Sequence, residues 1–286
     1  MLSLGIRRLE GWARIPRFNI DKEDRKPLGN SGEYINAIGI GTWNIYNYRN
    51  AEEALSSAVE MGINVFETAG MYADGLAEEL IGRLVSKVGR DGIFIVIKIL
   101  SYNLTNEESA IKAVQISLKR LRTSYVDLLL VHGIHELLSI SHQIRILEML
   151  AERGYTRYIG VSNFRLKELK EAIESTRKYR IVVNQVTYNI LNKKIEKDLL
   201  PFAIKNSILI QACSPLGKGS VIKHPLLIKI ADVYNKTPAQ IALNFIISRP
   251  YVMAITKTEQ KSHVMEIKDA MGWRLDERDI ELLESL

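Results

Sequence analysis

Short apolar segments rich in β-branched residues recur along the chain at about one per thirty residues, the length of one strand followed by one helix. Several are apolar almost throughout, as parallel strands covered by helices must be. The pattern predicts eight strands, at residues 37–42, 63–69, 93–99, 125–132, 157–163, 181–189, 208–215 and 252–258.

Helical spacing fills the gaps between these segments. In the third gap, Thr105 with Glu108 three residues later suggests a capping box at the start of a helix. Apolar residues then fall on one face of that helix, at Ile111, Val114, Leu118 and Leu121.

Eight strands that alternate with helices, with no linker between them, predict a single (β/α)8 TIM barrel over residues 25–286. Residues 1–24 add no strand and form a separate N-terminal leader. An open doubly wound sheet is the alternative, but no G-x-G-x-x-G motif follows the first strand. In such barrels the functional residues gather at the carboxyl ends of the strands.

Composition agrees with one globular domain. Of the 286 residues, 47% are hydrophobic and 25% are charged, which excludes a disordered chain. No uninterrupted apolar run approaches the roughly 18 residues that a membrane span requires. The single cysteine, Cys213, cannot close an intrachain disulfide or build a metal cluster. With no signal peptide visible, we expect a soluble protein of the reducing cytoplasm without a membrane partner.

The net charge of +6 is compatible with anionic substrates or cofactors, but no basic tract typical of nucleic-acid binding is present. Part of the excess lies in residues 1–27, which hold seven basic and four acidic residues. The opening segment MLSLGIRRLEGWARI is weakly amphipathic, so an interfacial helix is conceivable. We favour a mobile leader, or a start codon placed too early.

Two charged residues interrupt predicted strands. Lys98 lies in IFIVIKIL, where every other residue is apolar, and Glu67 ends the preceding strand in NVFETA. Such a lysine either snorkels out at a strand end or meets a carboxylate, because an unpaired buried ammonium is costly. A structural ion pair between the two strands would by itself explain why these two charged residues lie within apolar strands.

Two further polar residues belong to the same end of the predicted barrel. His132 closes YVDLLLVH, and Tyr72 follows Glu67 in the loop AGMYADG. Taken alone, His132 is slightly more typical of a hydrogen-bonded core histidine. With Lys98 they come from consecutive strand ends, where the ammonium would lower the pKa of the Tyr72 phenol. Such a phenol can give a proton to a developing alkoxide, which the imidazole could orient.

Small polar groups end the later strands. Ser162 and Asn163 in GVSNF, and Gln185 after Asn184, could hold a carboxamide such as that of nicotinamide. Loop capping by the serine and asparagine is the alternative. The eighth strand ends at residues 257–258, where many barrels bind phosphate.

These motifs occur in one order, and in that order the chain resembles an aldo-keto reductase from about Lys26 to Leu286. LGNSGEYINAIGIGTW resembles the opening segment of the family, GINVFETAGMYADGLAEELIG its tyrosine signature, and SLKRLRTSYVDLLLVH the segment ending in the active-site histidine. GVSNF, VNQVTYN and SPLGKG follow at the expected spacing. The resemblance implies NAD(P)H-dependent reduction of small aldehydes, ketones or keto-sugars, without metal or flavin.

The resemblance also implies the catalytic roles. Tyr72 would be the general acid, Lys98 would lower its pKa, and His132 would orient the carbonyl. Glu67 would stand where the family has an aspartate paired with the lysine, and Trp43 would line the substrate pocket. The only expected partner is a small carbonyl substrate, and the chain is expected to be a monomer or a weak homo-oligomer.

The cofactor site follows from the same resemblance, with Ser162, Asn163 and Gln185 holding the nicotinamide carboxamide. NADP(H) is favoured because Lys257, Thr258 and Lys261 offer charge and a hydroxyl to a 2′-phosphate, and NAD(H) remains possible. The cofactor-binding residues implied are Gly41, Thr42, Ser162, Asn163, Gln185, Cys213, Ser214, Leu216, Lys257, Thr258 and His263.

Four departures from the family pattern are visible. Glu67 is one methylene longer than the usual aspartate, and Cys213 stands where many members stack a tyrosine on the nicotinamide. His263 replaces an arginine that often grips the 2′-phosphate, and Ile267 an asparagine that often meets the adenine. Because no long C-terminal loop precedes Leu286, we expect a wide and permissive pocket.

Two other functions compete with reduction. A nucleotide-binding regulatory or scaffold barrel with little turnover is compatible with Glu67 and Cys213. The complete set of Tyr72, Lys98 and His132 argues against it. A sugar-phosphate isomerase barrel would need a second catalytic carboxylate, and none is evident.

Overall fold

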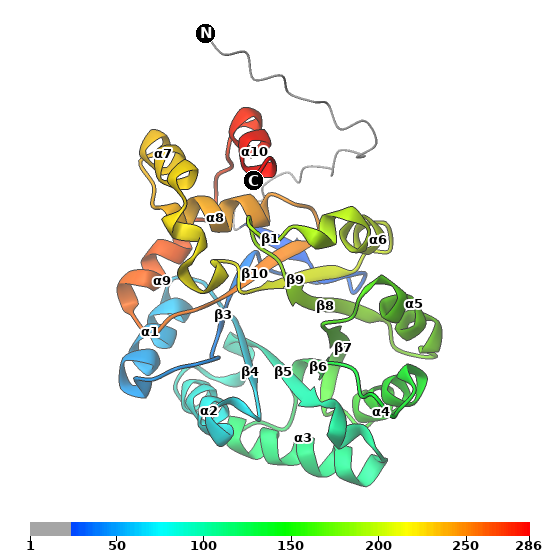
Figure 1. Ribbon diagram of the computed structural model, residues 1–286. Coiled ribbons are helices and arrows are strands. Elements are labelled where there is room, and N and C mark those ends of the chain that lie inside the picture. Colours follow the sequence, from blue (N-terminus) through cyan, green and yellow to red (C-terminus); the bar gives the residue numbers. More distant parts are fainter. Residues whose placement is uncertain (1–23) are drawn as a thin grey trace.

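The computed structural model describes residues 24–286, in which eight parallel strands form a closed barrel ringed by helices (Figure 1). The order around the barrel is β10-β3-β4-β5-β6-β7-β8-β9, so the last strand pairs with the first. This confirms the predicted (β/α)8 barrel. Its strands are β3 (Ile38–Gly41), β4 (Val65–Ala69), β5 (Phe94–Leu100), β6 (Val126–His132), β7 (Thr156–Ser162), β8 (Ile181–Thr187), β9 (Leu209–Cys213) and β10 (Val252–Lys257).

A helix follows each barrel strand, and the stretch from β9 onward carries two additional helices, α7 and α10 (Figure 1). The helices are α1 (Tyr48–Glu60), α2 (Leu76–Val88), α3 (Glu107–Leu121), α4 (Ile140–Glu152), α5 (Leu166–Ser175), α6 (Leu199–Lys205), α7 (Pro225–Tyr234), α8 (Pro238–Ile247), α9 (Lys261–Lys268) and α10 (Glu277–Glu284).

The start of α3 differs from the sequence prediction by one residue. The N-cap is Asn106, whose side chain accepts a hydrogen bond from the Ser109 backbone N–H at 2.9 Å. Thr105 has helical backbone angles and belongs to the preceding turn. The capping box at Thr105 is therefore wrong, because asparagine caps a helix as well as threonine does and here has the extended backbone that a cap requires.

A short antiparallel hairpin of β1 (Arg25–Pro27) and β2 (Tyr34–Asn36) closes the amino-terminal end of the barrel. Leu28 and Ile35 are buried in the apolar cluster that fills the barrel interior, beside Val182. Gly29 has φ +56°, and a Cβ there would lie 2.9 Å from the Val182 backbone. The hairpin can approach this closely only because that turn position has no side chain.

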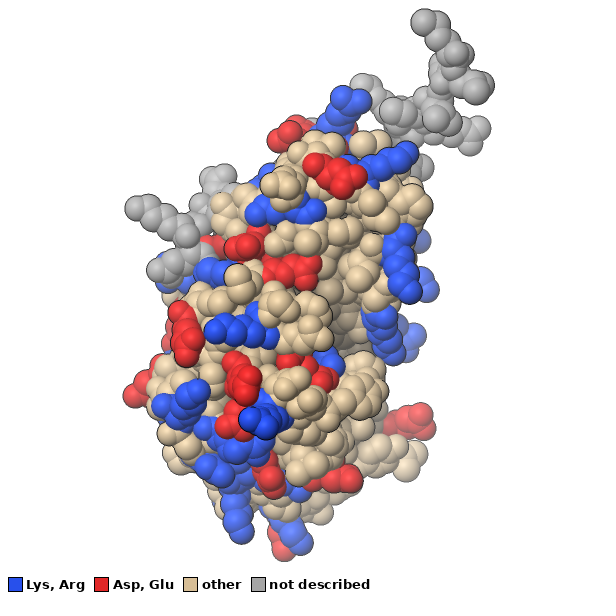
Figure 2. All heavy atoms as spheres, turned by 90° about the vertical axis from the view of Figure 1, so that its left-hand side faces the viewer, with Lys and Arg blue, Asp and Glu red and all other residues tan. Residues whose placement is uncertain are grey.

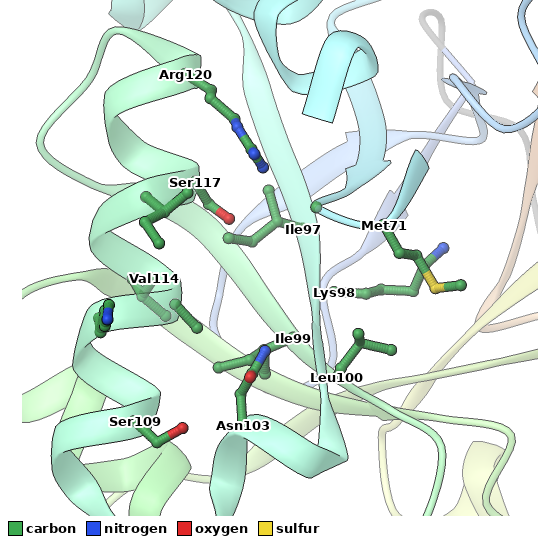
Figure 3. Close-up of a pocket in the computed structure, with 14 residues that line it drawn as sticks. Met71, Ile97, Lys98, Ile99, Leu100, Asn103, Ser109, Val114, Ser117 and Arg120 are labelled. Atoms are coloured by element: carbon green, nitrogen blue, oxygen red, sulfur yellow. The ribbon is translucent and has the colours of Figure 1, made fainter. Parts of the chain in front are cut away.

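Side chains alternate between the inside and the outside of the barrel wall. On β5, Phe94 and Val96 belong to the interior cluster, whereas Ile97 and Ile99 face α3. Lys98 points to the opposite side of the strand from these isoleucines (Figure 3). The two-residue period of a strand therefore directs Lys98 inward, above the apolar layers.

The outer surface mixes charges of both signs. On the face that carries α1 and α9, basic and acidic side chains lie interspersed (Figure 2). Within residues 24–286, no helix has both the length and the apolar character needed to cross a membrane.

Asp24 joins the start of the described chain to its carboxyl-terminal part. Its carboxylate, 1% exposed, accepts hydrogen bonds from both terminal nitrogens of Arg274 at 2.6 and 2.7 Å and from the Gly272 N–H at 2.8 Å. Residues 1–23 lie outside the described structure, so the predicted leader is represented here by Asp24 alone.

We expect Asp24→Ala to lower the free energy of unfolding by about 3 kcal/mol, because it leaves the guanidinium of Arg274 without its carboxylate. Thermal unfolding should shift down by several degrees. Deletion of residues 1–23 is the matched control and should leave the melting temperature unchanged. An Asp24→Ala variant with the melting temperature of the wild type would show that the Asp24–Arg274 ion pair does not stabilise the fold.

Candidate active site

The carboxyl ends of the barrel strands bring the candidate residues to one level. In the strand register, His132 lies opposite Ser162, and Ser162 lies opposite Gln185. On the other side of the barrel, Gly41 lies opposite Lys257. Parallel pairing therefore places residues that are far apart in sequence around one mouth.

These residues surround a cavity of about 590 Å³. The predicted residues that line it are Gly41, Trp43, Glu67, Tyr72, Lys98, His132, Ser162, Asn163, Gln185, Cys213, Ser214, Leu216 and Lys257. The sequence analysis did not single out the other lining residues, which are Asn44, Pro215, Lys218, Gly219, Ile255 and Thr256.

Three predicted cofactor residues do not line this cavity. The Thr42 hydroxyl donates to the Glu67 carbonyl at 3.1 Å and so ties β3 to β4. Thr258 is buried, and its hydroxyl accepts from the Gln260 N–H and donates to the Gln260 carbonyl. His263 is exposed in the first turn of α9.

Ile267, the fourth departure from the family pattern, is buried in the apolar core. It is 5% exposed and belongs to the large apolar cluster between the barrel wall and the helices. Its side chain therefore packs inward and does not face the mouth of the barrel.

A buried ion pair holds the centre of the site. The Lys98 ammonium bonds to the Glu67 carboxylate, and the two side chains are 3% and 4% exposed. Lys98 also donates to Gln185 Oε1 at 3.1 Å. Burial lowers the pKa of Lys98, to about 7, and the nearby Cys213 side chain partly opposes this shift. The longer Glu67 side chain therefore preserves the contact expected of an aspartate.

Tyr72 stands against this pair. The Lys98 ammonium lies 5.0 Å from the centre of the phenol ring. The centre of the His132 ring lies 6.3 Å from the centre of the Tyr72 ring, and the two rings are nearly perpendicular. Burial raises the pKa of Tyr72 above its ordinary value of 10.0. The net shift is therefore opposite to the lowering expected from Lys98, because burial of the phenol dominates and the nearby Cys213 side chain adds to it. The phenol stays protonated at neutral pH.

His132 is neutral in this environment. Burial, reinforced by the nearby charge of Lys98, lowers the pKa of the imidazole from 6.5 to about 4. Its Nδ1 atom is buried and has no hydrogen-bond partner among the described residues. A neutral imidazole carries one donor and one acceptor nitrogen, so it can orient a polar ligand without adding charge.

The amide groups of the site are partly engaged with each other. Gln185 accepts from Lys98 and donates to Gln211 Oε1 at 2.8 Å, while Asn163 donates to Ser162 Oγ at 3.3 Å. Sequence reasoning missed Gln211, which is fully buried on β9. The signal was present, because a glutamine in the apolar segment ILIQACSP is as anomalous as the lysine in IFIVIKIL.

Asn184, the neighbour of Gln185, has a different task. Its Nδ2 donates to the Phe164 carbonyl at 2.8 Å and so holds the loop after β7. Asn184 therefore holds a loop, whereas Gln185 faces the site, because adjacent side chains on a strand point to opposite sides.

The loop that carries Tyr72 is fastened to α3. This loop, η1 (Tyr72–Gly75), ends at Gly75 with φ +94°, where a Cβ would lie 2.2 Å from Arg120 Cζ. Arg120 also bonds to fully buried Glu78 at 3.1 Å. Beside it, a second cavity of about 390 Å³ separates β5 from α3 (Figure 3). Arg120 thus packs against the end of this loop from the α3 side.

The residues at the mouth fit a nicotinamide cofactor. The unpartnered Nδ1 of His132 and the amide and hydroxyl groups offer hydrogen bonds at one wall. Gly41 leaves room for the Glu67 carboxylate at this cavity, since a Cβ there would come within 3.0 Å of Glu67 Oε2 and Ile255. Within residues 24–286, no three His, Cys, Asp or Glu side chains gather in a metal-binding group.

Comparison with known proteins gives both the class and the family of this barrel with its polar mouth. The sequence profile of the aldo/keto reductase family matches residues 37–286. The chain therefore belongs to the aldo/keto reductase family.

Curated relatives and solved structures agree. Methylglyoxal reductase YeaE of Escherichia coli is 31% identical over 87% of this chain and 89% of its own length. Glyoxal reductase of Bacillus subtilis is 29% identical over 87% of this chain and 88% of its own length. An aldo-keto reductase of Klebsiella pneumoniae, solved with NADPH, superimposes with a TM-score of 0.85 at 29% identity, over 91% of this chain and 94% of that chain.

We expect Arg120→Met to lower stability by about 3 kcal/mol, because it strands the buried Glu78 carboxylate. It should also lower kcat more than it raises KM, since the Tyr72 loop loses its support. Combining it with Glu78→Met should restore the melting temperature, because replacing both partners of a buried pair by apolar residues is often neutral. Equal stability of the single and double variants would refute the coupling.

The lowered pKa of His132 predicts a pH-dependent contribution to stability. As pH falls below 6.5, the unfolded chain takes up the proton first, so stability present above 6.5 is lost between 6.5 and about 4. The urea midpoint of the wild type should therefore fall more steeply over this range than that of His132→Gln. Parallel midpoints for the two proteins would show that the imidazole is not held neutral.

Proposed function

We propose that this chain reduces small aldehydes, ketones or keto-sugars to alcohols, with Tyr72 as the general acid. The observation that carries the proposal is the buried cluster in which the Tyr72 phenol, the Lys98–Glu67 pair and the His132 ring meet at one cavity wall. Small 2-oxoaldehydes are the first substrates to test, because two of the relatives are named as methylglyoxal and glyoxal reductases.

A bound nicotinamide cofactor would supply the hydride, and the residues of the chain would manage the proton. Tyr72 gives its phenolic proton to the carbonyl oxygen as negative charge develops there. The Lys98 ammonium, 5.0 Å from the ring, stabilises the phenolate that remains. His132, neutral at working pH, donates a hydrogen bond that orients the same oxygen.

The raised pKa of Tyr72 suits the reductive direction. A phenol that resists ionisation keeps its proton until an alkoxide, a much stronger base, is formed. Glu67 positions Lys98 and keeps the buried cluster close to neutral. Trp43, about half exposed, and Leu216 offer apolar surface for the rest of the substrate.

For the cofactor, we propose NADP(H) with NAD(H) as a usable alternative. Ser162, Asn163 and Gln185 would hold the carboxamide, and Lys257 at the end of β10 would meet the phosphate. The Klebsiella pneumoniae neighbour solved with NADPH supports this choice.

The test is oxidation of NADPH and NADH by the wild type with methylglyoxal, a simple ketone and a keto-sugar. Tyr72→Phe should lose about 10²- to 10⁴-fold in kcat, the usual worth of general acid catalysis, without a change in melting temperature. Tyr102→Phe, an exposed tyrosine on the neighbouring loop, is the matched control and should retain full activity. Near wild-type turnover by Tyr72→Phe would remove the phenol from the mechanism.

A further inference from the structure

Glu259 follows Lys257 by two residues in the loop between β10 and α9, and its carboxylate binds three donors. It pairs with the Lys257 ammonium and accepts hydrogen bonds from the backbone N–H groups of Tyr46 at 3.0 Å and Asn47 at 2.8 Å. Partial burial opposes ionisation, but these hydrogen bonds lower the pKa of Glu259. The carboxylate is therefore charged at neutral pH.

This negative charge is fixed in place. Asn47 is the N-cap of α1, so the Glu259 carboxylate lies at the amino-terminal end of that helix, where the helix dipole favours an anion. Its side chain is 14% exposed. If it moved away, two backbone N–H groups and the Lys257 ammonium would lose their partner.

Lys257 connects the Glu259 carboxylate to the active site. It lines the site cavity, its side chain is 33% exposed, and its ammonium lies 5.6 Å from the centre of the Tyr46 ring. The loop after the last strand of a barrel, leading into a short helix, is a frequent position for phosphate. Here the lysine of that loop already has a carboxylate as its partner.

We propose that Glu259 sets the cofactor preference of this chain by holding Lys257 and opposing a 2′-phosphate. The inference rests on the proposed function, which brings the adenosine end of the cofactor to this loop. A phosphate dianion that pairs with Lys257 meets the fixed carboxylate beside the same ammonium. A free ribose hydroxyl instead donates a hydrogen bond to a carboxylate, which is how acidic residues select NAD in dinucleotide-binding folds.

The deciding measurement is the binding of NADPH and NADH, by fluorescence titration, to the wild type and to Glu259→Gln. We expect the ratio of the two affinities to shift toward NADPH by about tenfold, equivalent to about 1.4 kcal/mol. NADH affinity should stay level or fall. A ratio that moves by less than about twofold, within the scatter of such interaction energies, would overturn the proposal.

Two controls separate this effect from a change in net charge. Glu53→Gln on α1 removes one negative charge from an exposed side chain and should leave the ratio unmoved. In the Lys257→Met background, the gain from Glu259→Gln should be smaller than in the wild type, because the part of the effect that runs through the ammonium is lost. A full gain in that background would overturn the proposed route.

The test also distinguishes failure of this inference from failure of the proposed function. If the wild type oxidises neither cofactor with any carbonyl, the proposed function fails, while the binding ratio of 2′-AMP to 5′-AMP still tests Glu259. Should Glu259→Gln not fold, Glu259→Asp keeps the charge but shortens its reach to Lys257. This variant should shift the ratio in the same direction, and an unchanged ratio would again count against Glu259.

Discussion

The two-residue period of the barrel strands is the constraint on which both the core and the site depend. Inward positions before the strand ends are apolar, such as Val96 on β5 and Leu130 on β6, and the next inward positions of these two strands are Lys98 and His132. One pattern thus builds a packed floor and then a polar mouth. A one-residue slip of β5 would send Lys98 outward to α3 and place an isoleucine beside Tyr72.

The desolvation cost of the polar mouth is limited because its opposite charges are paired locally. Lys98 and Glu67 form a pair with almost no exposure, Gln185 satisfies a further donor, and His132 is neutral. A buried pair of this kind contributes little net stability, since desolvation offsets attraction. Its value lies in position, because it fixes one cation next to one phenol within an otherwise apolar interior.

The sequence predicted the barrel and most of the lining residues, since strand periodicity and strand ends can be read directly from the residue order. It did not predict the raised pKa of Tyr72, because a pKa depends on burial and on which side chains, here Cys213, come close in the folded chain. It also did not reveal that Thr258 bonds within its own loop, or that Glu259 meets the amides before α1. Such contacts depend on side-chain direction and on loops that meet only in the folded chain.

The contact between Asp24 and Arg274 joins residues at opposite ends of the described chain, and β10 must reach β3 before the barrel is closed. During synthesis, a ribosome that has released residues only as far as β9 leaves β3 and β9 as two open sheet edges. Unpaired edges readily join other chains. The unfinished barrel therefore has two unpaired edges at a stage when nearly all of its apolar residues have already been made.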